Sequence, residues 1–150
     1  MYTTVRLFIE GVTAPDVFAH VGTLDRYPAW MRLIHRVDPL EPDDGRPTWR
    51  VELRARIGPF ARSKQLRMVR TEYEPDHYAR FDRVQDDDRE HAEWTLEATV
   101  DEADGGAALT TALTYTGRLW GSGALQRVLD EEIRRGKVAL HDLLTAEPTR

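Results

Sequence analysis

The chain is 150 residues long and acidic, with 21 lysines and arginines against 26 aspartates and glutamates, a net charge of −5 at pH 7. General binding to nucleic acid needs a basic surface, so we expect no nucleic-acid partner. The lack of cysteine excludes disulfides, thiolate zinc sites and cysteine nucleophiles. No apolar run approaches the roughly 18 residues of a membrane helix. We therefore expect a cytoplasmic protein without stable membrane insertion, folded as a single domain over residues 1–150.

The N-terminal part of the chain predicts one strand followed by two short helices. Residues 2–10 alternate between apolar and polar side chains, which is the pattern of a strand with one buried face. Thr13 is expected to cap a helix of about two turns that ends at Gly22. A second short helix is expected over residues 24–33.

A series of antiparallel strands is expected in the middle of the chain. Residues 49–57 alternate clearly, and Gly58-Pro59 then breaks the strand, which favours a hairpin. In the next strand, which begins at Phe60, the apolar residues change parity, and this change indicates a bulge near Met68. The remaining strands are expected at residues 78–85, 92–100 and 109–119, with turns at Asp86-Asp87-Asp88 and Asp104-Gly105-Gly106.

The C-terminal part of the chain predicts one long helix. From Ser122 to Leu144, apolar residues recur at the spacing of a single helix face. A helix of about 24 residues spans roughly 36 Å, and a strand of about a dozen residues spans a similar length. One long helix can therefore lie along a curved antiparallel sheet and bury one face of most strands, which predicts an α+β fold.

The order of elements and several local sequences resemble a known superfamily. The residues that carry the resemblance are 14–18 (APDVF), 24–30 (LDRYPAW), the strand of Trp94 and the helix 122–144. Over essentially the whole chain, they resemble the helix-grip fold of the START/Bet v 1-like (SRPBCC) superfamily, in its polyketide cyclase/dehydrase branch. The resemblance implies a curved antiparallel sheet of about six or seven strands wrapped on a long C-terminal helix, with two short helices after the first strand.

The resemblance also implies a cavity between the sheet and the long helix that takes a hydrophobic small molecule. In similar cyclases an aromatic residue before a proline faces the cavity, and Tyr27 matches that position. The hairpin at Gly58-Pro59 and the helix of Tyr27 to Trp30 are expected to form the entrance. Any of the large aromatic residues can equally be plain core. The residues expected to bind the ligand are Tyr27, Trp30, Trp49, Val51, Leu53, Met68, Phe81, Trp94, Leu96, Tyr115, Leu129 and Gly136.

Glu132 is the first candidate for a catalytic role. At 100° per residue it falls within the apolar stripe of the long helix, where a carboxylate is costly unless it is paired, hydrogen-bonded or protonated. Gly136 lies one turn further along the same stripe and lacks side-chain bulk. Glu132 is therefore expected either to act as an acid, base or ligand anchor in the cavity, or to reach an arginine at the rim or solvent. Gly136 either leaves room for a ligand or allows close packing on the sheet.

Arg70 is the second candidate for a catalytic role. It shares the parity of Leu66 and Met68, so it is favoured over Arg67 as an inward cation, which would polarise a ligand carbonyl. Similar cyclases tend to place a tryptophan and an arginine four residues apart on a central strand, and this chain has no tryptophan there. An exposed arginine remains the alternative.

Motifs for other chemistry are missing from the sequence. The five histidines form no HExxH motif, the acidic run at 86–88 lacks the glycine and distal glutamate of a calcium loop, and the glycines at 121 and 123 lack the lysine of a phosphate loop. We therefore expect no metal and no cofactor. The sequence does not indicate an oligomeric state.

Three functions remain open at this point. The first is a binding protein or carrier for a hydrophobic small molecule, polyketide- or lipid-like. The alternative is a cofactor-independent polyketide cyclase or aromatase, which folds a poly-β-ketone for aldol closure and loss of water. The third is an interaction module without a ligand. A titratable group inside the cavity distinguishes an enzyme from a carrier, because acid–base catalysis needs a proton donor or acceptor there.

Overall fold

A curved seven-stranded antiparallel sheet and a long helix dominate the computed structural model, which describes residues 2–57, 59–84, 93–116 and 122–146. The strand order is β1-β7-β6-β5-β4-β3-β2. The elements are β1 (Tyr2–Glu10), α1 (Ala14–Val21), the 3₁₀ helix η1 (Leu24–Ala29), β2 (Ile34–Asp43), β3 (Arg46–Ile57), β4 (Phe60–Glu74), β5 (Tyr78–Arg83), β6 (Trp94–Ala103), β7 (Gly106–Tyr115) and α2 (Ser122–Thr145).

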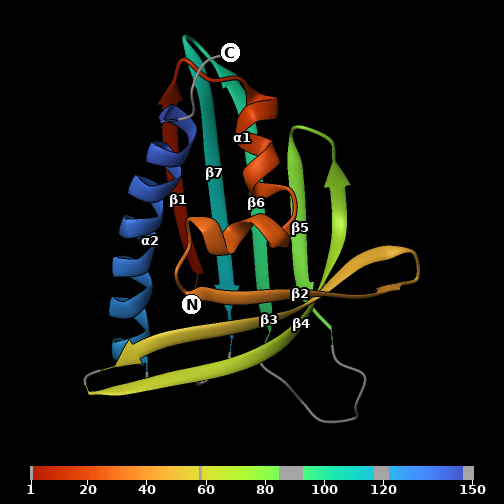
Figure 1. Cartoon of the computed structure of the whole chain (residues 1–150), viewed down its shortest axis with the longest axis vertical. Coiled ribbons are helices and arrows are strands. Elements are labelled where there is room, and N and C mark those ends of the chain that lie inside the picture. Colours follow the sequence, from red (N-terminus) through yellow and green to blue (C-terminus); the bar gives the residue numbers. More distant parts are fainter. Residues whose placement is uncertain (1, 58, 85–92, 117–121, 147–150) are drawn as a thin grey trace.

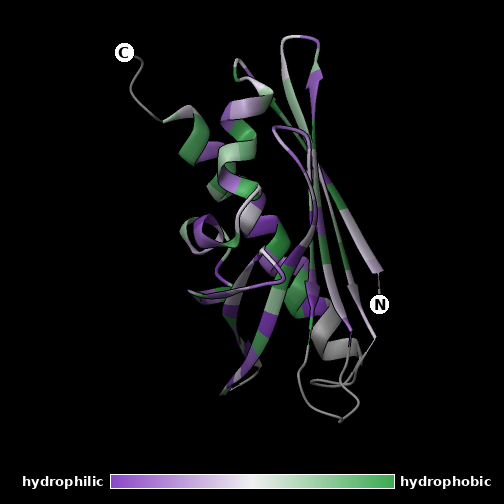
Figure 2. Cartoon of the chain, turned by 90° about the vertical axis from the view of Figure 1, so that its right-hand side faces the viewer, coloured by the Kyte–Doolittle hydropathy of each residue, from purple (hydrophilic) through white to green (hydrophobic). Residues whose placement is uncertain are grey.

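The helices all lie on one face of the sheet. Strands β1, β7, β6 and β5 run nearly parallel to α2, whereas β2, β3 and the first part of β4 cross below η1 at a steep angle; the end of β4 then bends upward beside β5 (Figure 1). Turned by 90°, the molecule has its upright strands on one side of the helices, while the other strands curve below the helices (Figure 2). The buried apolar residues come from both layers and meet between them. This arrangement confirms the predicted α+β helix-grip fold.

The first helix begins where the sequence predicts. Thr13 is its N-cap, because the Asp16 amide donates to Thr13 Oγ1 and the Thr13 amide donates to Asp16 Oδ2, both at 3.3 Å. Gly22 follows its last turn. The second helix is shorter than the predicted 24–33: it is a 3₁₀ helix that ends at Ala29, because the chain must turn before β2 begins at Ile34.

Strand β2 is the strand that the sequence analysis does not identify. It contains Pro39 and Pro42, which normally argue against a strand because proline cannot donate to the ladder. In the sheet, however, β2 lies at the edge and pairs only with β3. An edge strand tolerates proline on its unpaired side.

The remaining strand predictions are largely confirmed. The predicted bulge lies slightly later than Met68, since the register of β4 against β5 shifts between Arg70 and Glu72. The β6–β7 hairpin turns at Asp104-Gly105, where Gly105 has a φ of +83°. Gly58, the turn expected at residues 86–88, the expected strand end at Leu119 and Gly121 lie outside the described residues.

The outer face of the sheet carries a polar network centred on Asp82. Its carboxylate accepts hydrogen bonds from Thr71 Oγ1 at 2.5 Å, Thr95 Oγ1 at 2.8 Å and Arg80 Nε at 2.9 Å. Partial burial raises the pKa of Asp82, but these hydrogen bonds outweigh it and hold the pKa below its usual range. The network links β4, β5 and β6 across the face that the helices do not cover.

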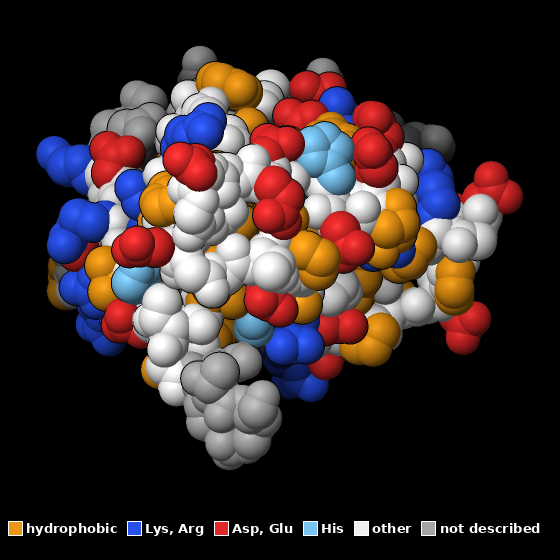
Figure 3. Space-filling model, turned by 90° about the horizontal axis from the view of Figure 1, so that it is seen from above, with side chains coloured by type: hydrophobic (Ala, Val, Ile, Leu, Met, Phe, Trp, Pro, Cys, Tyr) orange, Lys and Arg blue, Asp and Glu red, His pale blue; other side chains and the backbone are white. Residues whose placement is uncertain are grey.

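Charge is unevenly distributed over the surface. The end of the molecule seen from above carries many aspartate and glutamate side chains, interspersed with single apolar ones (Figure 3). Arginines gather elsewhere, along the N-terminal half of α2 and the end of β3. Within the described residues, no helix combines the length and the apolar character needed to cross a bilayer.

Candidate functional site

A small apolar cavity lies between the concave face of the sheet, η1 and α2. Its volume is about 90 Å³, smaller than the engineered cavity of about 150 Å³ that binds benzene in another protein. Thr3, Tyr27 and Thr111 are the wall residues that carry hydroxyl groups, and most of the rest is aliphatic or aromatic. The cavity is lined by Thr3, Val5, Leu24, Tyr27, Trp30, Met31, Leu33, Ile34, Val51, Leu53, Leu66, Met68, Trp94, Leu96, Thr111, Leu113, Leu129 and Ile133.

Most residues expected to contact a ligand do line this cavity. They are Tyr27, Trp30, Val51, Leu53, Met68, Trp94, Leu96 and Leu129. Three other aromatic residues lie behind the wall instead. The Phe81 ring packs between those of Trp49 and Tyr27, with centroid distances of 5.8 and 6.3 Å, and Tyr115 packs against Trp94. These three, Trp49, Phe81 and Tyr115, support the lining from the second layer of the core.

Gly136 also lies outside the cavity lining. A Cβ atom at this position would approach Met31 Cε to 3.0 Å and the Trp30 carbonyl oxygen to 3.5 Å. The missing side chain therefore allows α2 to pack closely on the segment after η1. Of the two alternatives for Gly136, the structure has close packing, but Gly136 packs on the segment after η1 and not on the sheet.

Tyr27 and Trp30 form a fixed wall of the cavity. The Tyr27 hydroxyl donates to the Val21 carbonyl oxygen at 2.9 Å, and Trp30 Nε1 donates to the His20 carbonyl oxygen at 3.2 Å. Their ring centroids are 4.9 Å apart, and complete burial raises the pKa of Tyr27 far above its usual value. Both polar groups thus fasten η1 to the end of α1. The expected entrance at Tyr27 to Trp30 is a buried wall; its expected partner Gly58 is not described.

Trp94 differs from these two residues because its polar group is not engaged. The side chain is 4% exposed, and its Nε1–H has no acceptor among the residues that the structure describes. Its ring lines the cavity and packs against Tyr115 with a centroid distance of 4.4 Å. A buried donor without a partner costs about 1–3 kcal/mol. A ligand oxygen that accepts this hydrogen bond would recover that free energy.

Arg70 lies on the concave side but does not reach the cavity. Its Nη1 donates to the Gly22 carbonyl oxygen at 2.9 Å, and its guanidinium group stacks 3.8 Å from the centre of the Tyr73 ring. A cation is favourable at this position, next to the C-terminal end of α1, although burial lowers the pKa of Arg70. Arg67 points elsewhere and lies 3.5 Å from Asp43. The predicted facing of Arg70 is correct, but its side chain extends away from the cavity to the end of α1.

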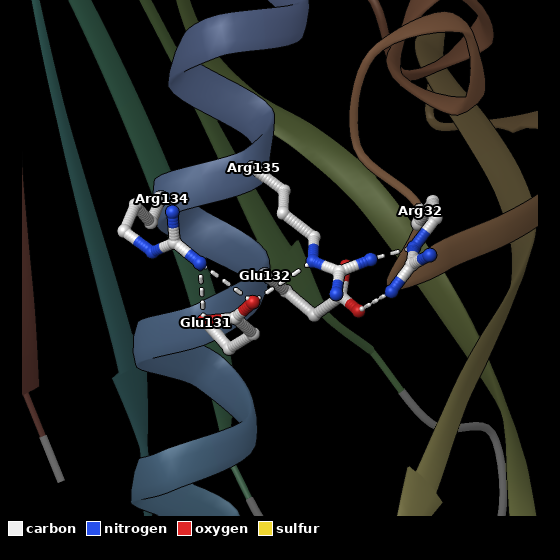
Figure 4. Close-up of polar contacts among 5 residues, drawn as sticks. All are labelled: Arg32, Glu131, Glu132, Arg134 and Arg135. Atoms are coloured by element: carbon white, nitrogen blue, oxygen red, sulfur yellow. Dashed lines mark hydrogen bonds and ion pairs between the residues drawn. The ribbon is translucent and has the colours of Figure 1, made fainter.

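Glu132 lies on the far side of the cavity wall and not inside it. Its carboxylate binds Arg32 through hydrogen bonds of 2.8 Å from Nη2 and 3.4 Å from Nε (Figure 4). The side chain of Glu132 is 13% exposed and that of Arg32 is 64% exposed. The helix therefore presents Leu129 and Ile133 to the cavity and Glu132 to its rim. The alternative in which Glu132 reaches a rim arginine is the one observed.

Several lining residues were not anticipated, although the sequence carries a signal for some of them. Val5 and Leu113 line the cavity from β1 and β7, two strands in which inward and outward residues alternate. Ile133 belongs to the apolar stripe of α2. Met31 and Ile34 had no such signal, because they follow the 3₁₀ helix, whose end the sequence does not mark. The other residues without a prediction are Thr3, Leu24, Leu33, Leu66 and Thr111.

Comparisons with solved structures find the same fold in proteins of low sequence identity. TTHA0849 from Thermus thermophilus superposes with a TM-score of 0.73 at 13% identity, over 99% of this chain and 100% of that one. The Zhui aromatase/cyclase from Streptomyces sp. R1128 gives 0.67 at 12% identity, over 97% and 94%. The di-domain aromatase/cyclase StfQ of the steffimycin biosynthetic pathway gives 0.68 at 17% identity, over 95% of this chain and 49% of that one.

The sequence itself gives the family. No curated protein matches it. The family model described as polyketide cyclase / dehydrase and lipid transport matches residues 3–144, which is nearly the whole chain and includes every element from β1 to α2. The chain therefore belongs to the polyketide cyclase/dehydrase and lipid transport family.

Proposed function

We propose that the protein binds a hydrophobic small molecule, polyketide- or lipid-like, in the cavity between the sheet and α2. The observation that carries this proposal is an apolar cavity lined by Trp94, a buried residue whose Nε1–H has no acceptor in the described residues. Apolar walls with a few placed polar groups are typical of small-molecule sites. The ligand is expected to be mainly apolar, with an oxygen atom that accepts from Trp94.

Binding is favoured over acid–base catalysis by what lines the cavity. Aldol cyclisation needs a proton donor or acceptor within hydrogen-bond reach of the substrate. In the described wall, the titratable side chain is Tyr27, whose hydroxyl already donates a hydrogen bond to the Val21 carbonyl oxygen. The two catalytic candidates, Glu132 and Arg70, are engaged outside the cavity. The similarity to aromatase/cyclases is thus a similarity of fold, on which functions differ widely.

A ligand larger than a few atoms requires the wall to move. Met31 is the part of the wall best suited to this, because methionine is flexible and tolerates many neighbours. A second apolar space of about 30 Å³ lies beside the first, and Met31 lines both. Displacement of the Met31 side chain would join the two spaces without breaking a hydrogen bond of the fold.

The proposal is tested by two probes that differ in one acceptor. We expect 2-acetonaphthone, which carries a ketone oxygen, to bind about five- to tenfold more tightly than 2-ethylnaphthalene, since one neutral hydrogen bond contributes about 1 kcal/mol. Trp94→Phe should remove this preference, whereas Trp49→Phe, in the second layer, should retain it. Isothermal titration calorimetry measures both affinities. If neither probe binds, or if Trp94→Phe keeps the preference, the proposal is wrong.

A further inference from the structure

A second, larger concavity lies on the other side of the cavity wall. It is a groove of about 700 Å³ between the N-terminal half of α2, the end of β3 and the segment that follows η1. We call it the arginine groove, and it is lined by Arg32, His35, Arg54, Ala55, Arg56, Ala61, Arg127, Val128, Glu131, Glu132 and Arg135. Five arginines thus face two glutamates in a chain whose net charge is −5.

The arginines of the groove are only partly neutralised. Arg32 pairs with Glu132, and Arg135 pairs with Glu131 at 2.9 Å (Figure 4). The other three, Arg54, Arg56 and Arg127, form no ion pair within the described part of the chain. Guanidinium groups bind carboxylate and phosphate oxygens through paired hydrogen bonds, and several of them around one groove favour an anion there.

The arginine groove and the apolar cavity share their walls. Leu53 of β3 lines the cavity and the next residue, Arg54, lines the groove. On α2, Leu129 and Ile133 line the cavity, whereas Glu132 lines the groove. The segment after η1 is divided in a similar way: Leu33 and Ile34 line the cavity, and the flanking residues Arg32 and His35 line the groove. The same elements thus supply lining residues to both spaces.

The Arg32–Glu132 ion pair joins two of these walls. It links the segment after η1 to α2, and its arginine is 64% exposed. The Glu132 side chain is 13% exposed, so solvent reaches the pair mainly at Arg32. Ion pairs that solvent reaches contribute little to stability and are screened by salt. An anion that enters the groove competes with Glu132 for Arg32, and breaking this pair frees the segment after η1, including Met31, to move away from α2.

We propose that the ligand is amphipathic, with its apolar part in the cavity and a carboxylate or phosphate head group in the arginine groove. This inference rests on the proposed function, because it assumes that the cavity takes the apolar part. It narrows the ligand class from hydrophobic molecules in general to anionic amphiphiles. Arg54, Arg56 and Arg127 bind the head group, and Arg32 exchanges Glu132 for it.

The test compares decanoate, decyl phosphate and 1-decanol below their micelle concentrations, by isothermal titration calorimetry. At low salt both anions should bind at least about tenfold more tightly than decanol, and high salt should shrink the difference. Substituting Arg54, Arg56 and Arg127 together by Gln should reduce the affinity for the anions to that for decanol and leave decanol binding unchanged. The matched control replaces Arg6, Arg26 and Arg50 by Gln, which removes the same charge at exposed positions outside both spaces. It should keep the preference.

A second variant acts in the opposite direction. Glu132→Gln releases Arg32 and removes one negative charge from the groove, so the affinity for decanoate should rise about two- to fivefold while decanol binding stays unchanged. A fall in affinity for decanoate would contradict the proposal.

The outcomes separate this inference from the proposed function. If decanol binds and the anions bind no better, the amphiphile inference is wrong and apolar binding stands. If none of the three probes binds, both are wrong. If inorganic phosphate alone displaces decanoate completely while decanol remains bound, the arginine groove is a separate anion site, as for an acidic protein partner, and the two-part ligand is wrong. If decyl phosphate alone is preferred and decanoate is not, the source of the head group is a phosphate ester.

Discussion

Replacement of Met31 by alanine should enlarge the cavity at a moderate cost in stability. The change removes three heavy atoms and leaves a space on the order of 70 Å³ at interior packing density. Joined with the spaces of about 90 and 30 Å³ that Met31 now lines, this gives a cavity larger than the roughly 150 Å³ that accommodates benzene in another protein. Because Met31 is only partly buried, the free energy of unfolding should fall by about 1–2 kcal/mol, below the usual range for a fully buried methionine.

Urea unfolding with and without benzene measures both effects. A ligand that binds only the folded state raises the unfolding free energy, so benzene should stabilise Met31→Ala more than the unchanged protein. Leu144→Ala is the matched control, since Leu144 is also partly buried in the core and lines neither space. It should lose stability without gaining benzene binding. If Met31→Ala and Leu144→Ala respond equally to benzene, Met31 does not separate the two spaces and the reasoning about the wall is refuted.

Three further predictions concern the parts that hold the site in place. Trp30→Ala should lower the free energy of unfolding by about 3–5 kcal/mol in a urea titration, since it empties a buried site and leaves the His20 carbonyl without its donor; a loss below about 1 kcal/mol would show that Trp30 is not structural. Tyr27→Phe should cost about 1 kcal/mol through the unpaired Val21 carbonyl, with unchanged affinity for 2-ethylnaphthalene by calorimetry. For Asp82, whose folded-state pKa is depressed, the stabilisation is fully present above the pKa of an unfolded aspartate and is lost as the pH falls through the folded-state pKa; Asp82→Asn should flatten this acid limb of a stability-against-pH curve.

The sequence predicts the fold well because the spacing of apolar residues and the residues that cap helices or form turns are local properties. Alternation in residues 49–57 and the Thr13 cap depend only on neighbours in the chain, and both occur as expected. Strand β2 could not be predicted in this way, because its prolines are acceptable only at an edge, and the position of a strand in the sheet is not a local property. The end of η1 was missed for the same reason, since tertiary packing determines where the chain leaves the helix.

The candidate site was predicted in its apolar part and not in its polar part. Strand parity decides which side of the sheet a Cβ atom faces, so short side chains such as Val51 and Leu96 line the cavity as expected. Parity does not determine where a long side chain ends: Arg70 faces inward but reaches the end of α1. For Glu132, helix geometry gives the angle between residues but not the rotation of the whole helix against the sheet, and a modest roll moves a carboxylate from the cavity to its rim.

The hydrogen bonds of the wall indicate where a ligand enters. On the side of α1, Tyr27 and Trp30 are fully packed and donate to backbone carbonyls, so opening there breaks two buried hydrogen bonds. On the side of the arginine groove, the contact between α2 and the segment after η1 includes the partly exposed Arg32–Glu132 pair and the packing of Met31 on Gly136. The second side opens at the lower cost, because an ion pair whose arginine is exposed can be exchanged for another anion and methionine has several rotamers. Access from the groove would deliver the apolar part of an amphiphile to the cavity while its head group stays among the arginines.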